Sequence, residues 1–263
     1  MQVILWAATG TGFTFLMTAL GAAMVFLLRG SVKASVQRIF LGFAAGVMIA
    51  ASVWSLLLPA VEEAEASGLP GWLPAAGGFI LGIAFLMLCD VFLPHLHLDR
   101  GRPEGLRSSW KRTTLLVLAV TLHNIPEGMA VGLSFARAAW HDFEPTSLSA
   151  AVALAVGMGI QNFPEGAAVS LPLREEGLSS GRAFLLGSLS GLVELLFGVL
   201  VVLIAGGIQP LMPWFLSFAA GAMMYVVAEE LIPEAHLGEH SHAGTLGVMG
   251  GFLVMMVLDV ALG

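Results

Sequence analysis

Eight long apolar runs dominate this sequence and leave little room for elements of any other kind. They span about 4–28, 37–60, 72–93, 113–136, 147–171, 183–206, 211–232 and 244–262. An apolar run of about 18 residues or more is long enough to cross a bilayer as a helix. Only 11% of the residues are charged, well below the roughly 25% of soluble domains. We therefore predict an all-α membrane protein of eight transmembrane helices, with residues 1–263 forming one polytopic domain.

Basic residues in the short loops predict the orientation of these helices, because lysine and arginine stay on the cytoplasmic side. Ten of the eleven lie between runs one and two, three and four, or five and six, and only Arg137 lies on the other side. Eight crossings then place both termini outside. The first run is too long for a signal peptide and has no basic segment before it. We expect it to remain as one helix of a multi-pass protein in a bacterial inner membrane.

Two pairs of runs are similar in sequence. Residues 41–48 (LGFAAGVM) recur as 216–223 (LSFAAGAM), and Gly-Gly-Phe at 77–79 recurs at 250–252. An even-numbered and an odd-numbered helix cross the membrane in opposite senses. Helices 1–3 and 6–8 would therefore be inverted repeats, with helices 4 and 5 as a central pair. Inverted repeats around a binding site near the midplane are typical of secondary transporters. The alternative is a chance likeness between helices rich in Ala, Gly and Leu.

The central pair carries a duplicated motif. Residues 123–128 read His-Asn-Ile-Pro-Glu-Gly, and residues 161–166 read Gln-Asn-Phe-Pro-Glu-Gly. A charged group at membrane depth costs roughly 2.5–3.5 kcal/mol on insertion scales, and it persists where it faces protein, water or an ion. Residues four apart lie on one face of a helix, so His123 points with Glu127 and Gln161 with Glu165. The glycine of each motif permits close approach of a neighbouring helix.

This pattern predicts a cation site between helices 4 and 5. Imidazole with carboxylate is a common ligand set for zinc, and amide and carboxylate oxygens suit harder ions. If the two helices face each other, Glu127 and Glu165 can bridge two cations. Each motif proline lacks an N–H and frees a carbonyl four residues back. The alternative is a pair of proline-kinked helices with protonated, hydrogen-bonded glutamates, which leaves His123 and the duplication without a role.

With these motifs on the two central helices of eight, the chain resembles the ZIP (Zrt/Irt-like protein) family of divalent-metal transporters. The second motif is similar to that of the prokaryotic GufA-like branch. The resemblance implies import of zinc, with cadmium, iron, manganese or cobalt as further substrates. It also implies an elevator-like motion of helices 1, 4, 5 and 6 against helices 2, 3, 7 and 8. The binuclear metal site would consist of His123, Asn124, Glu127, Gln161, Asn162, Glu165 and Glu194.

The motif departs from many family members at two positions. Many have His where this chain has Gln161, and some have Asp where it has Asn162. An amide carbonyl is a weaker zinc ligand than imidazole, so Gln161 loosens selectivity for zinc. Asn162 removes a negative charge from the second metal position, which puts occupancy by two ions in doubt.

Other polar residues have more than one interpretation. Glu194 has no charged partner in its own helix, and a ligand role competes with that of a buried protonated acid. Met48 offers a thioether to a soft ion, although methionine in an apolar helix is usually core. A transport path is predicted past Glu62, Asp90, Glu230, Asp259, His95, His97, His236 and His240. Solvated loops and ordinary helix ends are the alternatives for these positions.

The function that the sequence favours is transport of a divalent metal cation, with Zn²⁺ as substrate, from outside into the cytoplasm by alternating access. A proton-coupled carrier of a non-metal solute could use Glu127 and Glu165 as relays, but it would not need His123 or the motif amides. An intramembrane hydrolase would need a nucleophile or a metal-activated water, and the sequence has no His-Glu-x-x-His motif. We therefore expect no enzyme activity. The expected partners are divalent ions and the bilayer, not nucleic acid, and glycine-rich helix faces are compatible with a homodimer.

Overall fold

The computed structural model describes residues 1–28, 33–92, 112–205, 209–236 and 242–262. Within these ranges, eight helical segments are long and apolar enough to cross a membrane. They are Gln2–Leu27, Ala34–Ala66, Trp72–Phe92, Thr113–Trp140, Pro145–Glu175, Ser180–Ala205, Met212–Ala235 and Ala243–Leu262. The prediction of eight helices is confirmed. The second segment extends past its expected end at residue 60, because the helix continues to Ala66.

Several of these segments contain more than one helical element. The elements are α1 (Gln2–Ala22), α2 (Met24–Leu27), α3 (Ala34–Ala51), η1 (Ser52–Leu57), α4 (Leu58–Ala66), α5 (Trp72–Phe92), α6 (Arg112–Trp140), α7 (Pro145–Glu175), α8 (Ser180–Ala205), η2 (Gln209–Leu211), α9 (Met212–Val226), η3 (Val227–Leu231), α10 (Ile232–Ala235) and α11 (Ala243–Leu262). Both η1 and η3 are π-helical turns, whereas η2 is a 3₁₀ turn. The second and seventh crossings therefore each contain a π-helical turn inside an α-helix.

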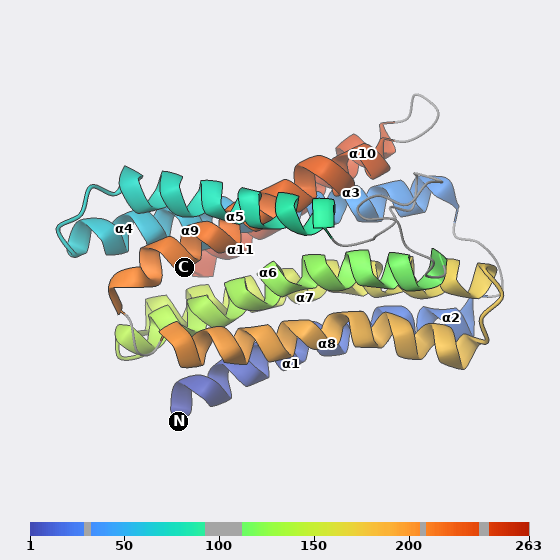
Figure 1. Ribbon diagram of the computed structural model, residues 1–263, viewed down its shortest axis with the longest axis horizontal. Coiled ribbons are helices and arrows are strands. Elements are labelled where there is room, and N and C mark those ends of the chain that lie inside the picture. The colour runs from blue at the N-terminus through green and yellow to red at the C-terminus, as the bar shows by residue number, and fades with distance from the viewer. Residues whose placement is uncertain (29–32, 93–111, 206–208, 237–241, 263) are drawn as a thin grey trace.

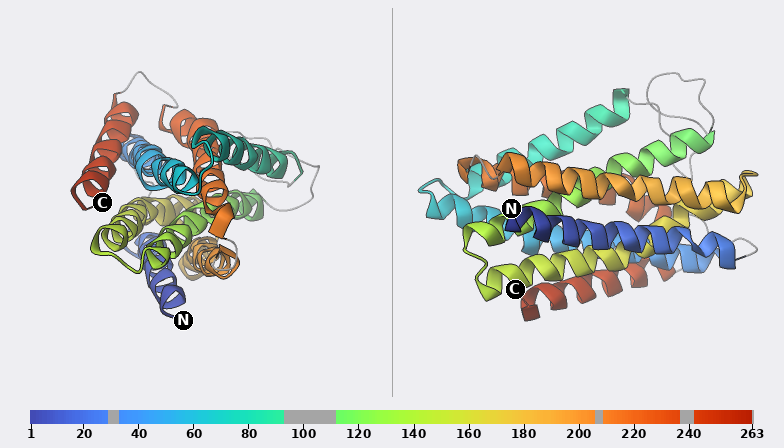
Figure 2. Two further views of the ribbon diagram at one scale, coloured as in Figure 1. Left: turned by 90° about the vertical axis from the view of Figure 1, so that its left-hand side faces the viewer. Right: turned by 90° about the horizontal axis from the view of Figure 1, so that it is seen from below.

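The helices form two layers, which are seen from the side in Figure 1 and end-on in Figure 2. The motif bundle contains α1, α2, α6, α7 and α8. The flanking bundle contains α3, α4, α5, α9, α10 and α11. In the motif bundle, α1 packs along α7 and α8, and α6 packs along α8; in the flanking bundle, α3 packs along α11, and α5 along α9. Contacts of α3 with α7 and of α6 with α9 join the two layers.

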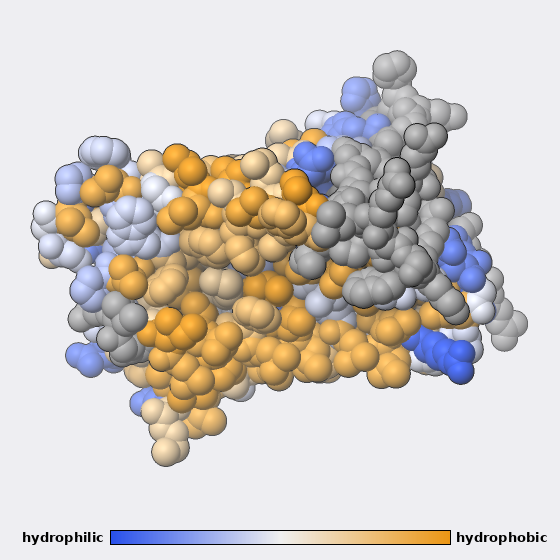
Figure 3. Space-filling model, in the orientation of Figure 1, coloured by the Kyte–Doolittle hydropathy of each residue, from blue (hydrophilic) through white to orange (hydrophobic). Residues whose placement is uncertain are grey.

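The middle of the molecule presents an apolar surface. Figure 3 shows a broad apolar band across one face, with polar side chains towards both ends. Leu81, Leu196 and Leu253, on three different helices, each have more than half of their surface exposed. Small residues such as Ala45 and Ala219 fill the interior instead, which lets the helices approach closely. This distribution is the one expected of a protein whose outer surface faces lipid.

The packing of the flanking bundle supports the internal repeat. Gly46 of α3 lies against the backbone of Phe252 in α11, and Gly221 of α9 lies against the backbone of Phe79 in α5. Each glycine belongs to the repeated eight-residue segment, and each phenylalanine belongs to a Gly-Gly-Phe. The second helix therefore packs on the eighth as the seventh packs on the third.

The π-helical turns extend this repeat beyond the residues that match in sequence. The turn η1 begins four residues after Met48, and η3 begins four residues after Met223. These methionines are the last residues of the two matching segments. The two halves of the flanking bundle thus share a local backbone distortion that their sequences alone do not reveal.

The two ends of the molecule differ in the residues that they carry. The Arg137 end contains Glu62, Arg137 and Asp259, and the Lys33 end contains Lys33 and His236. Both chain termini lie at the Arg137 end, on the left in Figure 1. That both termini share one end agrees with an even number of crossings, and the assignment of this end to the outside stays a prediction.

Candidate metal site

The duplicated motif lies in the middle of two unbroken helices. Helix α6 continues through Pro126, and α7 continues through Pro164 and Pro172. The first two residues of each motif are polar, but their side chains are more than nine-tenths buried; they are His123, Asn124, Gln161 and Asn162. Glu127 and Glu194 are buried to the same extent. The neighbouring helices approach closely at the motif glycines. A side chain at Gly128 would meet the backbone of Glu194, and one at Gly166 would meet the backbone of Thr18.

Two amide side chains of α7 connect the buried carboxylates of α6 and α8. Gln161 Nε2 donates hydrogen bonds to Glu127 Oε2 at 2.8 Å and to Asn162 Oδ1 at 2.7 Å. Asn162 Nδ2 donates to Glu194 Oε2 at 2.6 Å. The chain of contacts therefore runs from Glu127 through Gln161 and Asn162 to Glu194. The structure brings together residues of three helices that the resemblance assigned to one site.

The remaining motif residues contact other elements. Asn124 Nδ2 donates to the carbonyl oxygen of Ser190 in α8 at 2.9 Å. His123 Nε2 lies 2.7 Å from Glu230 Oε1, which belongs to η3 in the flanking bundle. Glu230 was expected on the transport path or at an ordinary helix end. It contacts the motif, and α10 continues the helix beyond it to Ala235. This contact links the two bundles at the candidate site.

The electrostatics of the cluster favour a positive guest. Glu127, Glu165 and Glu194 lie close enough for their charges to repel one another. Among the described lysines and arginines, none forms an ion pair with these three carboxylates. Like charges in a medium of low dielectric are costly unless something neutralises them. A proton or a bound cation can do so, and the carbonyl oxygen Gln161 Oε1, buried without a hydrogen-bond partner among the described residues, offers a further ligand.

The carboxylates do not converge on one point. Among the described residues, no three His, Cys, Asp or Glu side chains are arranged to hold an ion. These side chains contact other groups instead. The amide of Gln161 donates a hydrogen bond to Glu127, and the amide of Asn162 donates one to Glu194. The ring of His123 contacts Glu230. Coordination of an ion would replace these hydrogen bonds and would require the Gln161 amide to turn its oxygen inward.

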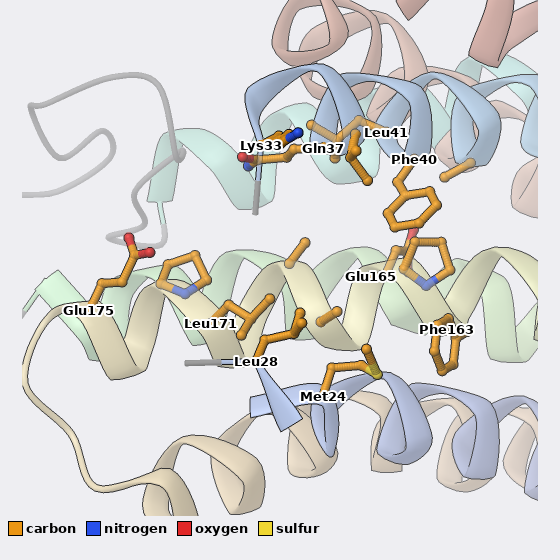
Figure 4. Close-up of a pocket in the computed structure, with 16 residues that line it drawn as sticks. Met24, Leu28, Lys33, Gln37, Phe40, Leu41, Phe163, Glu165, Leu171 and Glu175 are labelled. Atoms are coloured by element: carbon orange, nitrogen blue, oxygen red, sulfur yellow. The ribbon is translucent and has the colours of Figure 1, made fainter. Parts of the chain in front are cut away.

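A cavity of about 550 Å³ connects Glu165 with the Lys33 end. It lies between α2, α3 and α7. Figure 4 shows Glu165 beside Phe40 and Phe163 at one side of the cavity, with Lys33 and Glu175 further along it. Most of its other lining residues are apolar. Neither Asp90 nor Glu230 lines this cavity, although a path to the cytoplasm was predicted past both. Residues of α3 and α7 form most of its lining instead.

A second cavity, of about 400 Å³, lies at the Arg137 end. Its lining includes two residues predicted to lie on the transport path, Glu62 and Asp259, but no residue of either motif. Asp259 is buried, and its Oδ1 accepts a hydrogen bond from the hydroxyl of Ser55 at 2.6 Å. Beside them, Arg137 pairs with Glu62 at 3.1 Å and with Glu63 at 2.9 Å. The ion pair between Glu62 of α4 and Arg137 of α6 thus forms part of the lining of this cavity.

The other predicted positions have different surroundings. Met48 is fully buried in the apolar core, and Asp90 lies near Tyr225. His236 is exposed, and its ring nitrogens contact the Ile232 carbonyl at 2.9 Å and the Thr245 hydroxyl at 3.2 Å. His95, His97 and His240 lie outside the described residues.

One nucleophile pattern occurs in the sequence at a place that does not support catalysis. Residues 177–181 read Gly-Leu-Ser-Ser-Gly, which fits Gly-x-Ser-x-Gly. That motif needs a strand before the serine and a helix after it, and the described chain contains no strand. Here Ser179 lies in the turn before α8, and its hydroxyl accepts a hydrogen bond from the Arg182 N–H at 3.4 Å.

Sequence reasoning missed a residue of α1 that touches the site. Thr18 is buried, and its hydroxyl lies 3.2 Å from Glu194 Oε1. The signal available in the sequence was the spacing of Thr11, Thr14 and Thr18, which places three hydroxyls on one face of an otherwise apolar helix.

Comparison with known proteins assigns the chain to a family. A family model described as ZIP Zinc transporter matches residues 101–259. The chain is 39% identical to human "Zinc transporter ZIP11" over 98% of its length and 97% of that protein. It is 39% identical to "Zinc transporter GufA" of Myxococcus xanthus, covering 94% of each chain, and 42% identical to "Zinc transporter ZIPB" of Bordetella bronchiseptica, covering 98% of this chain and 82% of that one. With its motifs on α6 and α7 and its eight apolar helices, the chain belongs to the ZIP zinc transporter family.

Proposed function

We propose that this protein carries Zn²⁺ across the membrane through a site formed by His123, Glu127, Gln161 and Glu165. The observation that carries the proposal is the pair of buried carboxylates on α6 and α8, Glu127 and Glu194, whose hydrogen-bond partners are amides and a hydroxyl and which form no ion pair with a described lysine or arginine. The partly buried Glu165 of α7 lies near both of them. The relatives named as zinc transporters support the same substrate. Cadmium, iron, manganese and cobalt remain candidate substrates, since amide and carboxylate oxygens accept several divalent ions.

The contacts suggest how the site accepts its ion. Zinc would bind the imidazole of His123 and the carboxylates of Glu127 and Glu165, and the amide of Gln161 would turn its oxygen towards the metal. A second ion would lie near Asn124, Asn162 and Glu194, with Glu127 between the two positions. Bringing these ligands together exchanges hydrogen bonds for metal–ligand bonds, so binding should be coupled to a local rearrangement.

The two cavities suggest the direction of movement. The cavity at Glu165 is open towards the Lys33 end, which we take as the cytoplasmic end. At the Arg137 end, ion pairs between α4 and α6 hold the two bundles together. We therefore interpret this arrangement as an inward-facing state. Sliding of the motif bundle against the flanking bundle would open the site to the cavity lined by Glu62 and Asp259, so that an ion could enter from outside.

Zinc influx into proteoliposomes that contain a zinc-sensitive dye tests the proposal. Glu127→Gln and Glu165→Gln keep the shape of each side chain but remove a charge from the site, so both should reduce influx strongly. Asp142→Asn is the matched control. Asp142 is exposed just after α6, so this substitution removes one negative charge away from the site. Unchanged influx in both glutamate variants would refute the site, and zinc-independent proton movement that depends on Glu127 would favour a proton-coupled carrier.

A further inference from the structure

Helix α1 contributes a hydroxyl to the candidate site, although its sequence contains no charged residue between Gln2 and Ala22. Thr18 Oγ1 lies 3.2 Å from Glu194 Oε1 and 3.2 Å from the carbonyl oxygen of Thr14. Thr14, one turn earlier, is also within hydrogen-bonding reach of Glu194. Both threonines are buried. The contact joins residues 176 positions apart in the sequence, so it is a product of the fold and not of local helix geometry.

Two glycines bring Thr18 to this position. A methyl group at Gly191 of α8 would lie 2.8 Å from Thr18 Cγ2, which is too close for any real side chain. A methyl group at Gly166, the last residue of the second motif, would collide with the backbone oxygen of Thr18. Helix α1 can therefore approach α7 and α8 closely only because both positions lack a side chain. The close packing of α1 on α7 at Gly166 and on α8 at Gly191 places the hydroxyl of Thr18 beside Glu194.

The result is a carboxylate whose two oxygens are both fixed. Glu194 Oε2 accepts a hydrogen bond from Asn162 at 2.6 Å, and Glu194 Oε1 accepts one from Thr18. Partners behind a metal ligand determine its orientation, and their loss typically weakens metal binding by about 10–100-fold. Because Asn162 would itself contact the ion, the threonines of α1 are the partners that can hold Glu194 while the amide rearranges. Of these, Thr18 is the one that packs against glycines of both α7 and α8.

We propose that Thr18 is a positioning residue, whose hydroxyl holds Glu194 in the orientation needed to bind the second divalent cation. This inference rests on the proposed function. Thr18 does not touch the ion; it acts through Glu194. Because this hydroxyl belongs to α1, the orientation of Glu194 at the second metal position also depends on how α1 packs in the motif bundle.

The chain provides a matched control one heptad earlier. Thr11 lies on the same face of α1, is also buried, and packs against a glycine of α8, Gly198. Its hydroxyl donates only to the carbonyl oxygen of Ala7, at 2.7 Å. Replacing either threonine by valine exchanges a hydroxyl for a methyl group in the same kind of environment, but only Thr18→Val removes a partner of Glu194.

The test is calorimetric titration of the purified full chain in detergent with Zn²⁺ and with Cd²⁺. We expect Thr18→Val to weaken the second, lower-affinity binding event by about 10-fold or more, while the first event stays close to that of the unmodified protein. Thr18→Ser, which keeps the hydroxyl, should restore binding, and Thr11→Val should leave it unchanged. In a background of Glu194→Ala, Thr18→Val should cause no further loss, since coupled residues do not add.

Several outcomes would overturn the inference. Equal weakening by Thr18→Val and Thr11→Val would indicate general packing, and so would failure of Thr18→Ser to restore binding. A further loss from Thr18→Val in the Glu194→Ala background would show that Thr18 does not act through Glu194. If Thr18→Val is too unstable to titrate, Thr18→Ala is compared with Thr18→Ser: weaker second binding in Thr18→Ala alone supports the positioning role, and equal binding in the two variants refutes it. Absence of any binding to the unmodified protein would refute the proposed function, whereas normal binding to Thr18→Val would refute only the positioning role.

Discussion

The close approach of α6 and α8 at Gly128 leads to a prediction whose size can be worked out. A methyl group at this position would lie 2.7 Å from the carbonyl carbon of Glu194, and closer still to its Cα and its carbonyl oxygen, whereas ordinary contact begins at 3.4 Å. The helices would have to separate by about 1 Å at this level, because the nearest atoms belong to the backbone. Overpacking of this kind lowers the stability by about 1–3 kcal/mol. The higher helix propensity of alanine raises it by about 0.5–1 kcal/mol. Gly128→Ala should therefore lower the free energy of unfolding by about 1–2 kcal/mol.

The same displacement should affect transport more than stability. Glu194 provides the backbone that α6 touches and the carboxylate that Asn162 and Thr18 hold. A shift of about 1 Å in a group that must be precisely placed can cost about 100-fold in rate. Zinc influx through Gly128→Ala should thus fall well beyond what the loss of folded protein explains.

Thermal unfolding in detergent and zinc influx in proteoliposomes measure the two effects. Gly12→Ala in α1 is the control, because a methyl group there meets nothing within 4 Å. It should raise the stability by about 0.5–1 kcal/mol and leave influx unchanged. If Gly128→Ala behaves like Gly12→Ala in both assays, the packing of α6 on α8 does not shape the site and the reasoning is wrong.

Three further predictions concern the gate, the ligands and the protons. Arg137→Gln removes the ion pairs with Glu62 and Glu63, each worth up to about 1 kcal/mol at a partly exposed site. Because these pairs join the two bundles, a cysteine introduced at position 134 in the adjacent cavity should then react a few times faster with a thiol reagent added at the Arg137 end, and an unchanged rate would show that the pairs do not close this end. Gln161→His supplies a stronger zinc ligand and should tighten zinc binding in calorimetry, while equal or weaker binding would argue against Gln161 as a ligand. Zinc influx should fall as the pH is lowered from about 7 to about 5, because metal ligands must release their protons to bind; influx that is constant over this range would exclude ligands that carry protons.

The fold was largely predictable because hydrophobic runs of membrane length leave few alternatives. The apolar runs also placed the duplicated motif on two central helices, α6 and α7. The metal site that the spacing within each motif predicts stays a prediction. What spacing could not supply was the partner of each side chain. The Thr18 hydroxyl reaches Glu194 from α1. The spacing of the threonines in α1 indicates that they share one face of the helix, but not which residue that face meets.

Contacts between the bundles were predicted least well. Glu230 meets His123 because η3 and α10 continue the seventh helix past the level of the motif. Glu62 was expected either to attract cations or to be solvated, but it pairs with Arg137 from the opposite bundle. Both contacts depend on how two layers of helices face each other, and sequence periodicity within one helix contains no information about that.

Anomalous diffraction at the zinc absorption edge, from crystals of the full chain soaked in Zn²⁺, tests the central claim most directly. The account predicts a strong peak between Glu127 and Glu165 within reach of His123, with the amide oxygen of Gln161 turned towards it, and no such peak in Glu127→Gln. Zinc bound only in the loops or at the Arg137 end, with the hydrogen bond from Gln161 to Glu127 still intact, would contradict it.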